Sequence, residues 1–229
     1  MTQVKICGLT NIEDVQVAVD EGVEFLGFIL YEKSPRYVTT ARVARIMSFL
    51  RGYDVPRIPV CIGVFVNPSV DEVEQALAHT GLQAAQVHKA TPDVIREMRT
   101  RTLGSLYPAV QPRTASEIVP YTALDDEAGV YPTAFYLPQL MVDAYHPDLA
   151  GGTGKQADLE LAAEIAASVP RLMLAGGLTA DNVATTIRAA QPWAVDVSSG
   201  VEASPGKKDH EKVRAFIRAV RAVDKEIAL

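Results

Sequence analysis

The sequence alternates short apolar runs with longer amphipathic segments from end to end, and this constrains the fold more than any other feature. Runs such as Val4–Cys7, Pro59–Val66 and Ala84–His88 have the length and composition of buried strands. Each is followed by a segment whose apolar residues recur at helical spacing. Because parallel strands need crossover connections, which helices usually supply, the pattern predicts an α/β protein with a parallel sheet.

Eight strand–helix units can be placed along the chain. The predicted strands are Val4–Cys7, Phe25–Leu30, Pro59–Val66, Ala84–His88, Leu103–Val110, Leu140–Asp143, Arg171–Ala175 and Trp193–Val197. The predicted helices are Asn11–Glu21, Thr40–Arg51, Ser69–Thr80, Pro92–Arg101, Thr114–Val119, Asp158–Ser168, Thr179–Ala190 and Asp209–Val223. Three helix starts have good capping side chains, namely Thr10 or Asn11, Ser69, and Thr179.

Eight such units can close into a barrel through right-handed crossovers, so residues 1–229 are predicted to form a single (β/α)8-barrel (TIM-barrel) domain. The competing arrangement is an open, doubly wound sheet. It would normally carry a glycine-rich phosphate-binding turn after its first strand. The first turn here, Cys7-Gly8-Leu9-Thr10, contains a single glycine, which favours the barrel.

Composition narrows the classes of function. A formal net charge of −6 argues against nucleic acid as a partner, because nucleic-acid binders usually carry a basic face. No stretch of about 18 apolar residues exists, so no membrane span is expected. The two cysteines form neither a disulfide framework nor a metal-ligand spacing, and the chain begins directly with its first predicted strand. The expected location is the cytoplasm.

Several unusual residues fall at the carboxyl ends of the predicted strands, where barrel enzymes form their active sites. Cys7 ends the first strand and Asp143 the sixth, and a strand-end acid is costly unless it is paired or functional. His88 ends the fourth strand, where a core or rim histidine is an equally good interpretation. Arg36, in the loop after the second strand, can bind a carboxylate with two hydrogen bonds. Cys61 lies in mid-strand and is predicted to be an inert buried thiol.

Glycines follow the last two strands, at Gly176, Gly177 and Gly200. Glycine lets backbone N–H groups approach an anion, and helix amino ends favour negative charge. Barrels often bind phosphate after strands seven and eight. We therefore predict a phosphate site at Gly176, Gly177, Ser199 and Gly200, with tight turns as the alternative interpretation.

The run Gly151–Lys155 resembles part of a P-loop, but that motif requires a glycine and a Ser or Thr where this chain has Leu149 and Gln156. We predict instead a mobile active-site loop, Ala144–Gly154, in which Gly152 contacts the substrate.

Lys5 and Cys7 share one side of the first strand and should point into the barrel, while Asp196 lies on the neighbouring eighth strand. We predict that Lys5 and Asp196 pair, because a buried charge needs a partner. A lysine beside a thiol also favours the thiolate, the form that can accept a proton.

Motifs spread along nearly the whole chain resemble the phosphoribosylanthranilate isomerase family of tryptophan biosynthesis. They occur in family order: Lys5–Thr10, Gly27-Phe28, Ser34-Pro35-Arg36, Gly63–Asn67, Gln86-Val87-His88, Gly151–Gly154, Ala175–Leu178, Asp196–Glu202 and Pro205–Asp209. Any one of them is weak, but together they are highly specific.

The resemblance implies an Amadori rearrangement of N-(5-phosphoribosyl)anthranilate to 1-(2-carboxyphenylamino)-1-deoxyribulose 5-phosphate, with no metal and no organic cofactor. By motif, Cys7 would be the general base and Asp143 the general acid, and Arg36 would hold the anthranilate carboxylate. His88, Gly152 and the glycines after the last two strands would bind the rest of this small phosphorylated substrate. The chain would be a monomer or a homodimer.

Three departures from the family pattern stand out. Lys89 occupies a position that is usually glycine, Ala157 and Leu159 replace Phe and Trp, and residues 103–138 match poorly and are longer than usual.

Two kinds of alternative remain open. One is another phosphosugar barrel isomerase or epimerase. The histidine-pathway aminoaldose isomerase has an acid where this chain has Cys7, and a metal-dependent epimerase would need clustered ligands where only His88 is suitably placed. The other is a non-catalytic phosphate-ligand binding barrel, which would keep the glycines but tolerate loss of Cys7 or Asp143.

Overall fold

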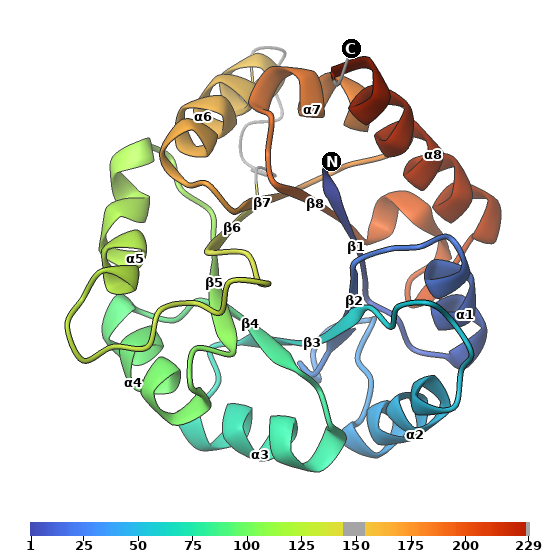
Figure 1. The fold of residues 1–229 in the computed structure, drawn as a ribbon, viewed down its shortest axis with the longest axis horizontal. Helices are drawn as coiled ribbons and strands as arrows, with labels where there is room; N and C mark the ends of the chain where they lie inside the picture. The colour runs from blue at the N-terminus through green and yellow to red at the C-terminus, as the bar shows by residue number, and fades with distance from the viewer. Residues whose placement is uncertain (144–153, 228–229) are drawn as a thin grey trace.

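The protein is a closed barrel of parallel strands surrounded by helices, as predicted (Figure 1). It is seen in a computed structural model that describes residues 1–143 and 154–227. The strands are β1 (Gln3–Cys7), β2 (Phe25–Ile29), β3 (Val60–Val66), β4 (Ala84–His88), β5 (Leu106–Val110), β6 (Leu140–Asp143), β7 (Leu172–Ala175) and β8 (Ala194–Val197). β8 pairs with β1, with Lys5 opposite Asp196, and this pairing closes the ring.

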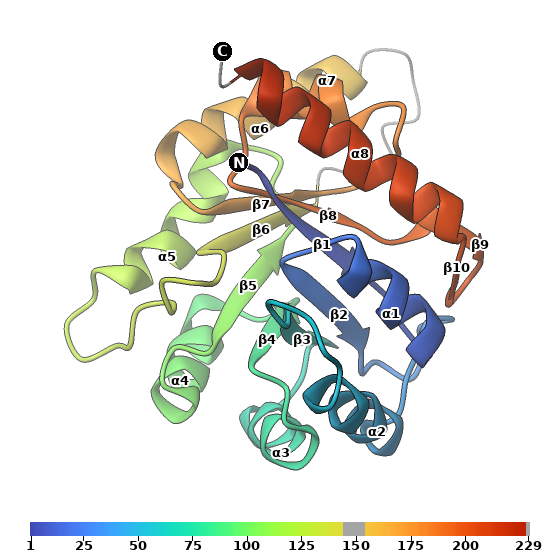
Figure 2. The ribbon, with the colours of Figure 1, turned by 45° about the vertical axis from the view of Figure 1, so that its right-hand side comes forward.

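The helices form the outer layer of the molecule (Figures 1 and 2). They are α1 (Ile12–Asp20), α2 (Thr40–Arg51), α3 (Val70–Thr80), α4 (Pro92–Thr102), α5 (Val119–Thr122), α6 (Gly154–Ser168), α7 (Val183–Ala190) and α8 (His210–Ile227). Asn11 caps α1, and Ser69 caps α3 in a reciprocal capping box with Glu72. Such caps stabilise a helix by about 1 kcal/mol, which explains why these two starts could be read from the sequence.

Residue alternation along the strands separates an inner core from an outer one. The inner core fills the barrel with side chains such as Phe25, Ile62, Tyr107, Met141 and Met173. Outward-facing strand residues pack instead against the helices, as Ile6 and Leu26 do. The barrel is thus packed through much of its length, which leaves the carboxyl ends of the strands as the place for a ligand.

The fifth unit differs most from the prediction. The strand starts at Leu106 rather than Leu103, because Leu103 adopts a left-handed backbone that ends α4. In place of a helix at Thr114–Val119, three short turns follow one another over Ala115–Ile118, Val119–Thr122 and Ala123–Asp125. The connection from there to β6 runs back across the ring of strands (Figure 1).

Two other helix starts were predicted wrongly. α6 begins at Gly154 rather than Asp158, and α7 begins at Val183 rather than Thr179. Asn182 explains the second error, because its side chain accepts a hydrogen bond from the Thr179 amide and donates one to the Gly177 carbonyl. Such local side-chain bonds compete with helix formation.

The eighth unit contains elements that the sequence did not predict. A 3-10 turn (Ser199–Val201) and a small hairpin of β9 (Glu202–Ser204) and β10 (Lys207–Lys208) precede α8. In the part of the chain that the structure describes, no helix combines the length and apolar character needed to cross a bilayer.

Candidate active site

The predicted site residues lie at one end of the barrel. Cys7 is the last residue of β1, His88 of β4 and Asp143 of β6. Gly176 directly follows β7, and Ser199 and Gly200 lie just beyond β8. Because all eight strands are parallel, these positions meet at the same mouth.

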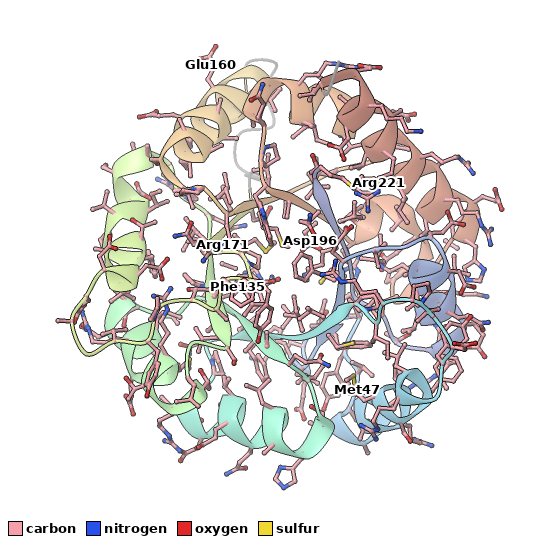
Figure 3. All side chains as sticks on the ribbon, viewed as in Figure 1. Met47, Phe135, Glu160, Arg171, Asp196 and Arg221 are labelled. Atoms are coloured by element: carbon pink, nitrogen blue, oxygen red, sulfur yellow. The ribbon has the colours of Figure 1, made fainter. Side chains whose placement is uncertain are left out.

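An ion pair lies inside the barrel below this mouth, as predicted. Lys5 Nζ is 3.0 Å from Asp196 Oδ2, and the two side chains are 0% and 6% exposed. Figure 3 shows Asp196 within the ring of strands. Burial opposes the charge on Lys5, but Asp196, with smaller contributions from Cys7 and Tyr107, outweighs it and raises the pKa of Lys5. Lys5 is therefore a permanent cation beside the site.

The pair is extended by a hydrogen-bond chain toward His88. Gln86 Oε1 accepts from Lys5 Nζ at 2.8 Å and from the Tyr107 hydroxyl at 2.9 Å. The Gln86 amide nitrogen then donates to His88 Nε2 at 2.7 Å. Burial, Lys5 and Lys89 lower the pKa of His88 to about 4. His88 is thus a neutral imidazole whose second nitrogen, Nδ1, carries the proton.

Cys7 is buried beside this network. A Cβ atom on Gly27 would lie 2.7 Å from Cys7 Sγ, so glycine at that position of β2 makes room for the thiol. Burial raises the pKa of Cys7, although Lys5 acts in the opposite direction. Lys5 favours the thiolate, as expected, but burial has the larger effect, so the pKa of Cys7 lies above its usual value in the ligand-free protein. Burial also raises the pKa of Cys61 to about 12, in keeping with an inert core thiol.

Asp143 lies within electrostatic reach of the same cluster. Its carboxylate accepts a hydrogen bond from Gln111 Nε2 at 3.2 Å. Burial raises the pKa of Asp196, and the charge of Asp143 adds to that effect. Asp196 in turn acts on Cys7. The two predicted proton-transfer groups thus share Asp196 as an electrostatic neighbour.

The glycine loops after β7 and β8 touch each other. A Cβ on Gly200 would lie 1.9 Å from the Leu178 carbonyl oxygen, so this glycine is required by packing between the loops. Gly177 has φ of 60°, in the left-handed region, and faces open space. These glycines do not directly precede α7 or α8, because α7 starts at Val183 and α8 at His210. Backbone amides at the loops themselves would have to bind an anion.

Arg36 already has a partner. Its Nε and Nη2 donate to both carboxylate oxygens of Glu202, at 2.7 to 3.1 Å. One edge of the guanidinium is therefore used within the protein. Neither Glu202 nor its second partner, Lys208, was assigned a role from the sequence, although both lie in family motifs.

Other functional candidates were missed as well. Gln86 alternates with His88 on β4, and a polar side chain at an inward position of an apolar strand was the available signal. Tyr107 and Gln111 belong to the poorly matching fifth unit, so no pattern singled them out.

The backbone at Lys89 shows why the family usually has glycine at this position. Its φ is 56°, in the left-handed region that glycine adopts without cost. Lysine there is strained but tolerated. The predicted loop Ala144–Gly154 falls outside the described residues up to position 153, and so does the predicted contact residue Gly152. Ala157 and Leu159 both fall within α6.

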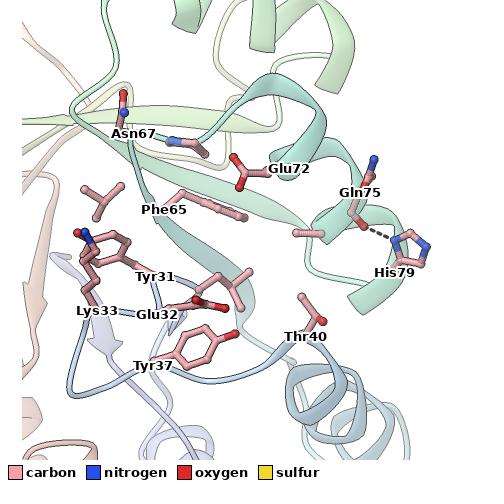
Figure 4. Close-up of a pocket in the computed structure, with 14 residues that line it drawn as sticks. Tyr31, Glu32, Lys33, Tyr37, Thr40, Phe65, Asn67, Glu72, Gln75 and His79 are labelled. Atoms are coloured by element: carbon pink, nitrogen blue, oxygen red, sulfur yellow. Dashed lines mark hydrogen bonds between the residues drawn. The ribbon is translucent and has the colours of Figure 1, made fainter.

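Two hollows border the rim of the mouth. One, of about 480 Å³, is lined by His88, Lys89 and Gln111 among others. The other, of about 530 Å³, lies between β2, β3 and α3 and has Tyr31, Tyr37 and Phe65 in its wall (Figure 4). The second holds none of the predicted site residues, and Phe65 packs on the outer side of the barrel. Only the first adjoins the candidate site. Among the described residues, no group of three or more His, Cys, Asp or Glu side chains is arranged to hold a metal ion.

Comparisons with known proteins agree with one another. A family model described as N-(5'phosphoribosyl)anthranilate (PRA) isomerase matches residues 4–219. The N-(5'-phosphoribosyl)anthranilate isomerase of Trichlorobacter lovleyi is 41% identical over 219 residues, covering 95% of this chain and 97% of the relative. That of Pelobacter propionicus is 39% identical over 228 residues, covering 99% of each.

Solved structures give the same result. The phosphoribosyl anthranilate isomerase of Thermotoga maritima superposes with a TM-score of 0.79 at 32% identity, covering 97% of this chain and 100% of that one. A structure of such an isomerase in complex with reduced 1-(o-carboxyphenylamino)-1-deoxyribulose 5-phosphate has a TM-score of 0.77 at 30% identity, with coverage of 97% and 100%.

Proposed function

The chain belongs to the N-(5'-phosphoribosyl)anthranilate isomerase family, and from that premise we propose that Cys7 and Asp143 are the base and the acid of its reaction. The enzyme is an isomerase of tryptophan biosynthesis that converts N-(5'-phosphoribosyl)anthranilate to 1-(2-carboxyphenylamino)-1-deoxyribulose 5-phosphate. The observation that supports the two roles best is the position of both groups, each the last residue of its strand at the same mouth of the barrel.

The reaction needs proton transfers to and from the substrate and no external oxidant. Asp143 gives a proton to the ribose ring oxygen as the C1–O bond breaks, and the nitrogen lone pair forms a C=N bond. Cys7 then takes the proton from C2, and those electrons form the C1=C2 bond of an enolamine. Tautomerisation places a proton on C1 and leaves a ketone at C2, so C1 is reduced and C2 is oxidised within one molecule. Each positioned group is worth about 10²- to 10⁴-fold in rate.

The remaining groups bind the two ends of the substrate. Backbone amides of Gly176, Gly177, Ser199 and Gly200 take the phosphate, and the open space over Gly177 supports this assignment. Arg36 binds the anthranilate carboxylate through the N–H groups of its guanidinium that do not contact Glu202. Neutral His88 donates from Nδ1 to the substrate, and Gly152, which lies outside the described residues, is proposed as a further substrate-binding residue.

The finer organisation is also proposed. Residues 1–229 act as one domain, in the cytoplasm, as a monomer or a homodimer. One similar structure is described as monomers generated from the dimeric isomerase of Thermotoga maritima, so both states are reasonable for a chain of this family.

The roles are tested by following the fluorescence decay of phosphoribosylanthranilate with wild type, Cys7→Ala and Asp143→Asn. Turnover should fall by about 10²-fold or more in each variant while the circular dichroism spectrum stays unchanged. Because burial raises the pKa of Cys7 above its usual value, kcat/KM of the wild type should still be rising at about pH 9, as a growing fraction of the thiol ionises. Asp143→Asn should keep this limb of the profile. Turnover near the wild-type rate in either variant would remove the role assigned to that residue.

A further inference from the structure

Arg36 is held by a carboxylate from the far end of the chain. Glu202 lies on β9, after the last barrel strand, and Arg36 lies in the loop after β2. Nε is 2.8 Å from Oε1 and Nη2 is 2.7 Å from Oε2, so both oxygens face one edge of the guanidinium. This two-point contact fixes the plane and the rotation of the group.

Glu202 is itself fixed before any ligand arrives. Its side chain is 5% exposed, and Oε1 also accepts from the Gly206 amide at 3.2 Å and from Lys208 Nζ at 3.1 Å. Lys208 is buried and donates to the Ser198 carbonyl, so the anchor leads back to the end of β8. The hairpin β9–β10 therefore holds the Glu202 carboxylate in a fixed position against Arg36.

The held arginine lies directly beside the catalytic strand end. A Cβ on Gly8 would lie 2.8 Å from Arg36 Cδ, so the arginine stem passes over the residue that follows Cys7. The Arg36 side chain keeps 21% exposure, and among the described residues its Nη1 makes no hydrogen bond. Arg36 and Lys208 carry two positive charges against the single negative charge of Glu202, which leaves one net positive charge for an anion.

We propose that Glu202 is a positioning residue that sets the site's preference for a carboxylate-bearing substrate, by holding Arg36 with Nη1 and the outer side of Nη2 available. The proposal rests on the carboxylate-binding role proposed for Arg36. Without Glu202 the guanidinium would turn freely or face Lys208 as a like charge, and the substrate carboxylate would meet a mobile, poorly placed donor.

The test compares two ligands that differ by one carboxylate. They are reduced 1-(o-carboxyphenylamino)-1-deoxyribulose 5-phosphate and its phenylamino analogue without the carboxyl group. Calorimetric titration of the wild type should show an affinity about 10- to 100-fold higher for the first, the range expected for a charge-assisted pair. In Glu202→Gln this ratio should fall at least about fivefold, while affinity for the carboxylate-free ligand changes less than about twofold. KM should rise more than kcat falls.

A double-variant cycle separates the two proposals. Arg36→Ala should abolish the carboxylate preference, and Glu202→Gln combined with Arg36→Ala should behave like Arg36→Ala alone. An unchanged preference in Arg36→Ala defeats the role of Arg36. A lost preference in Arg36→Ala with a wild-type preference in Glu202→Gln defeats only the role of Glu202.

Two further variants serve as controls, one for the general effect of losing a carboxylate–arginine contact and one for failure of Glu202→Gln to fold. Glu24→Gln weakens another partly buried carboxylate–arginine contact, in which Nη2 of Arg221 donates to both oxygens of Glu24, and it should lower stability without changing the ligand ratio. If Glu202→Gln fails to fold, Glu202→Asp decides instead. Its carboxylate is one methylene too short to reach both nitrogens, so the ratio should again fall, and a wild-type ratio would overturn the proposal.

Discussion

Two buried ion pairs lie at opposite ends of the barrel, and their carboxylates differ in how many hydrogen bonds they accept. Near the mouth, Lys5 pairs with Asp196, and among the described residues Asp196 Oδ1 has no hydrogen-bond partner. Beneath the strands, Arg99 of α4 pairs with Asp125, whose Oδ1 also accepts two bonds from Thr133 and whose Oδ2 accepts one from Gln139.

The difference indicates that the Arg99–Asp125 pair is a structural clamp, whereas the Lys5–Asp196 pair belongs to the candidate active site. The Arg99 pair anchors the connection between α5 and β6, and Arg171 adds bonds to the carbonyls of Thr133 and Leu137. Leu137 then packs into the inner core. The Lys5 pair anchors no loop. It acts instead on the environment of Cys7 and His88, and the charge of Asp143 acts on Asp196, so the pair lies among the proposed site residues. An acceptor left without a partner is costly in a scaffold, but it suits a place where a ligand arrives.

The sharpest way to break this comparison is Lys5→Met. It leaves the buried Asp196 without its cation and removes the charge that opposes desolvation of Cys7. We expect a loss of about 3–5 kcal/mol in unfolding free energy at pH 7, together with a fall in turnover of about 10²-fold or more. The stability loss should shrink at lower pH, since the folded variant keeps a raised pKa at Asp196 and takes up a proton there before the unfolded chain does.

Urea unfolding at pH 7 and pH 5, beside the fluorescence assay, measures both effects of Lys5→Met. Adding Asp196→Asn removes the uncompensated charge, so the double variant should regain stability without regaining turnover. If the double variant recovered activity, the pair would be a scaffold like the other one.

Arg99→Met is the equivalent substitution in the ion pair at the base of the barrel. Asp125 is 12% exposed, so water screens part of the lost interaction, and we expect a loss of about 2–4 kcal/mol. The melting temperature should fall, while kcat and KM of the folded fraction should stay within about twofold of wild type. A large change in KM would show that the clamp reaches the site.

The sequence predicted the site end of the molecule far better than the clamp end. Strand-end positions of Cys7, His88 and Asp143 follow from apolar periodicity alone, and so does the pairing of Lys5 with Asp196. These predictions succeeded because β-strand alternation and strand adjacency in a barrel are regular.

The clamp end has no such regularity. Asp125 and Thr133 contact Arg99 of α4, and Gln139 in turn contacts Asp125. These partners are too far apart in the sequence for a local pattern to encode their contacts. The same reason hid the contact between Glu202 and Arg36, whose partners are separated by most of the chain. The start of α7 failed because Asn182 bonds to nearby backbone instead of continuing the helix.

The smallest expected effect compares two hydroxyls, one from each end. Thr133 Oγ1 accepts from Arg99 and donates to Asp125, so Thr133→Val should cost about 1–2 kcal/mol. Ser198 Oγ is buried without a hydrogen-bond partner among the described residues, so Ser198→Ala removes a group that is already desolvated and should change stability by less than about 0.5 kcal/mol. Both are measured by urea unfolding at pH 7. Equal costs would mean that Ser198 has a partner in solution, such as a bound water. A cost confined to Thr133 would support the view that unsatisfied acceptors gather where the substrate binds.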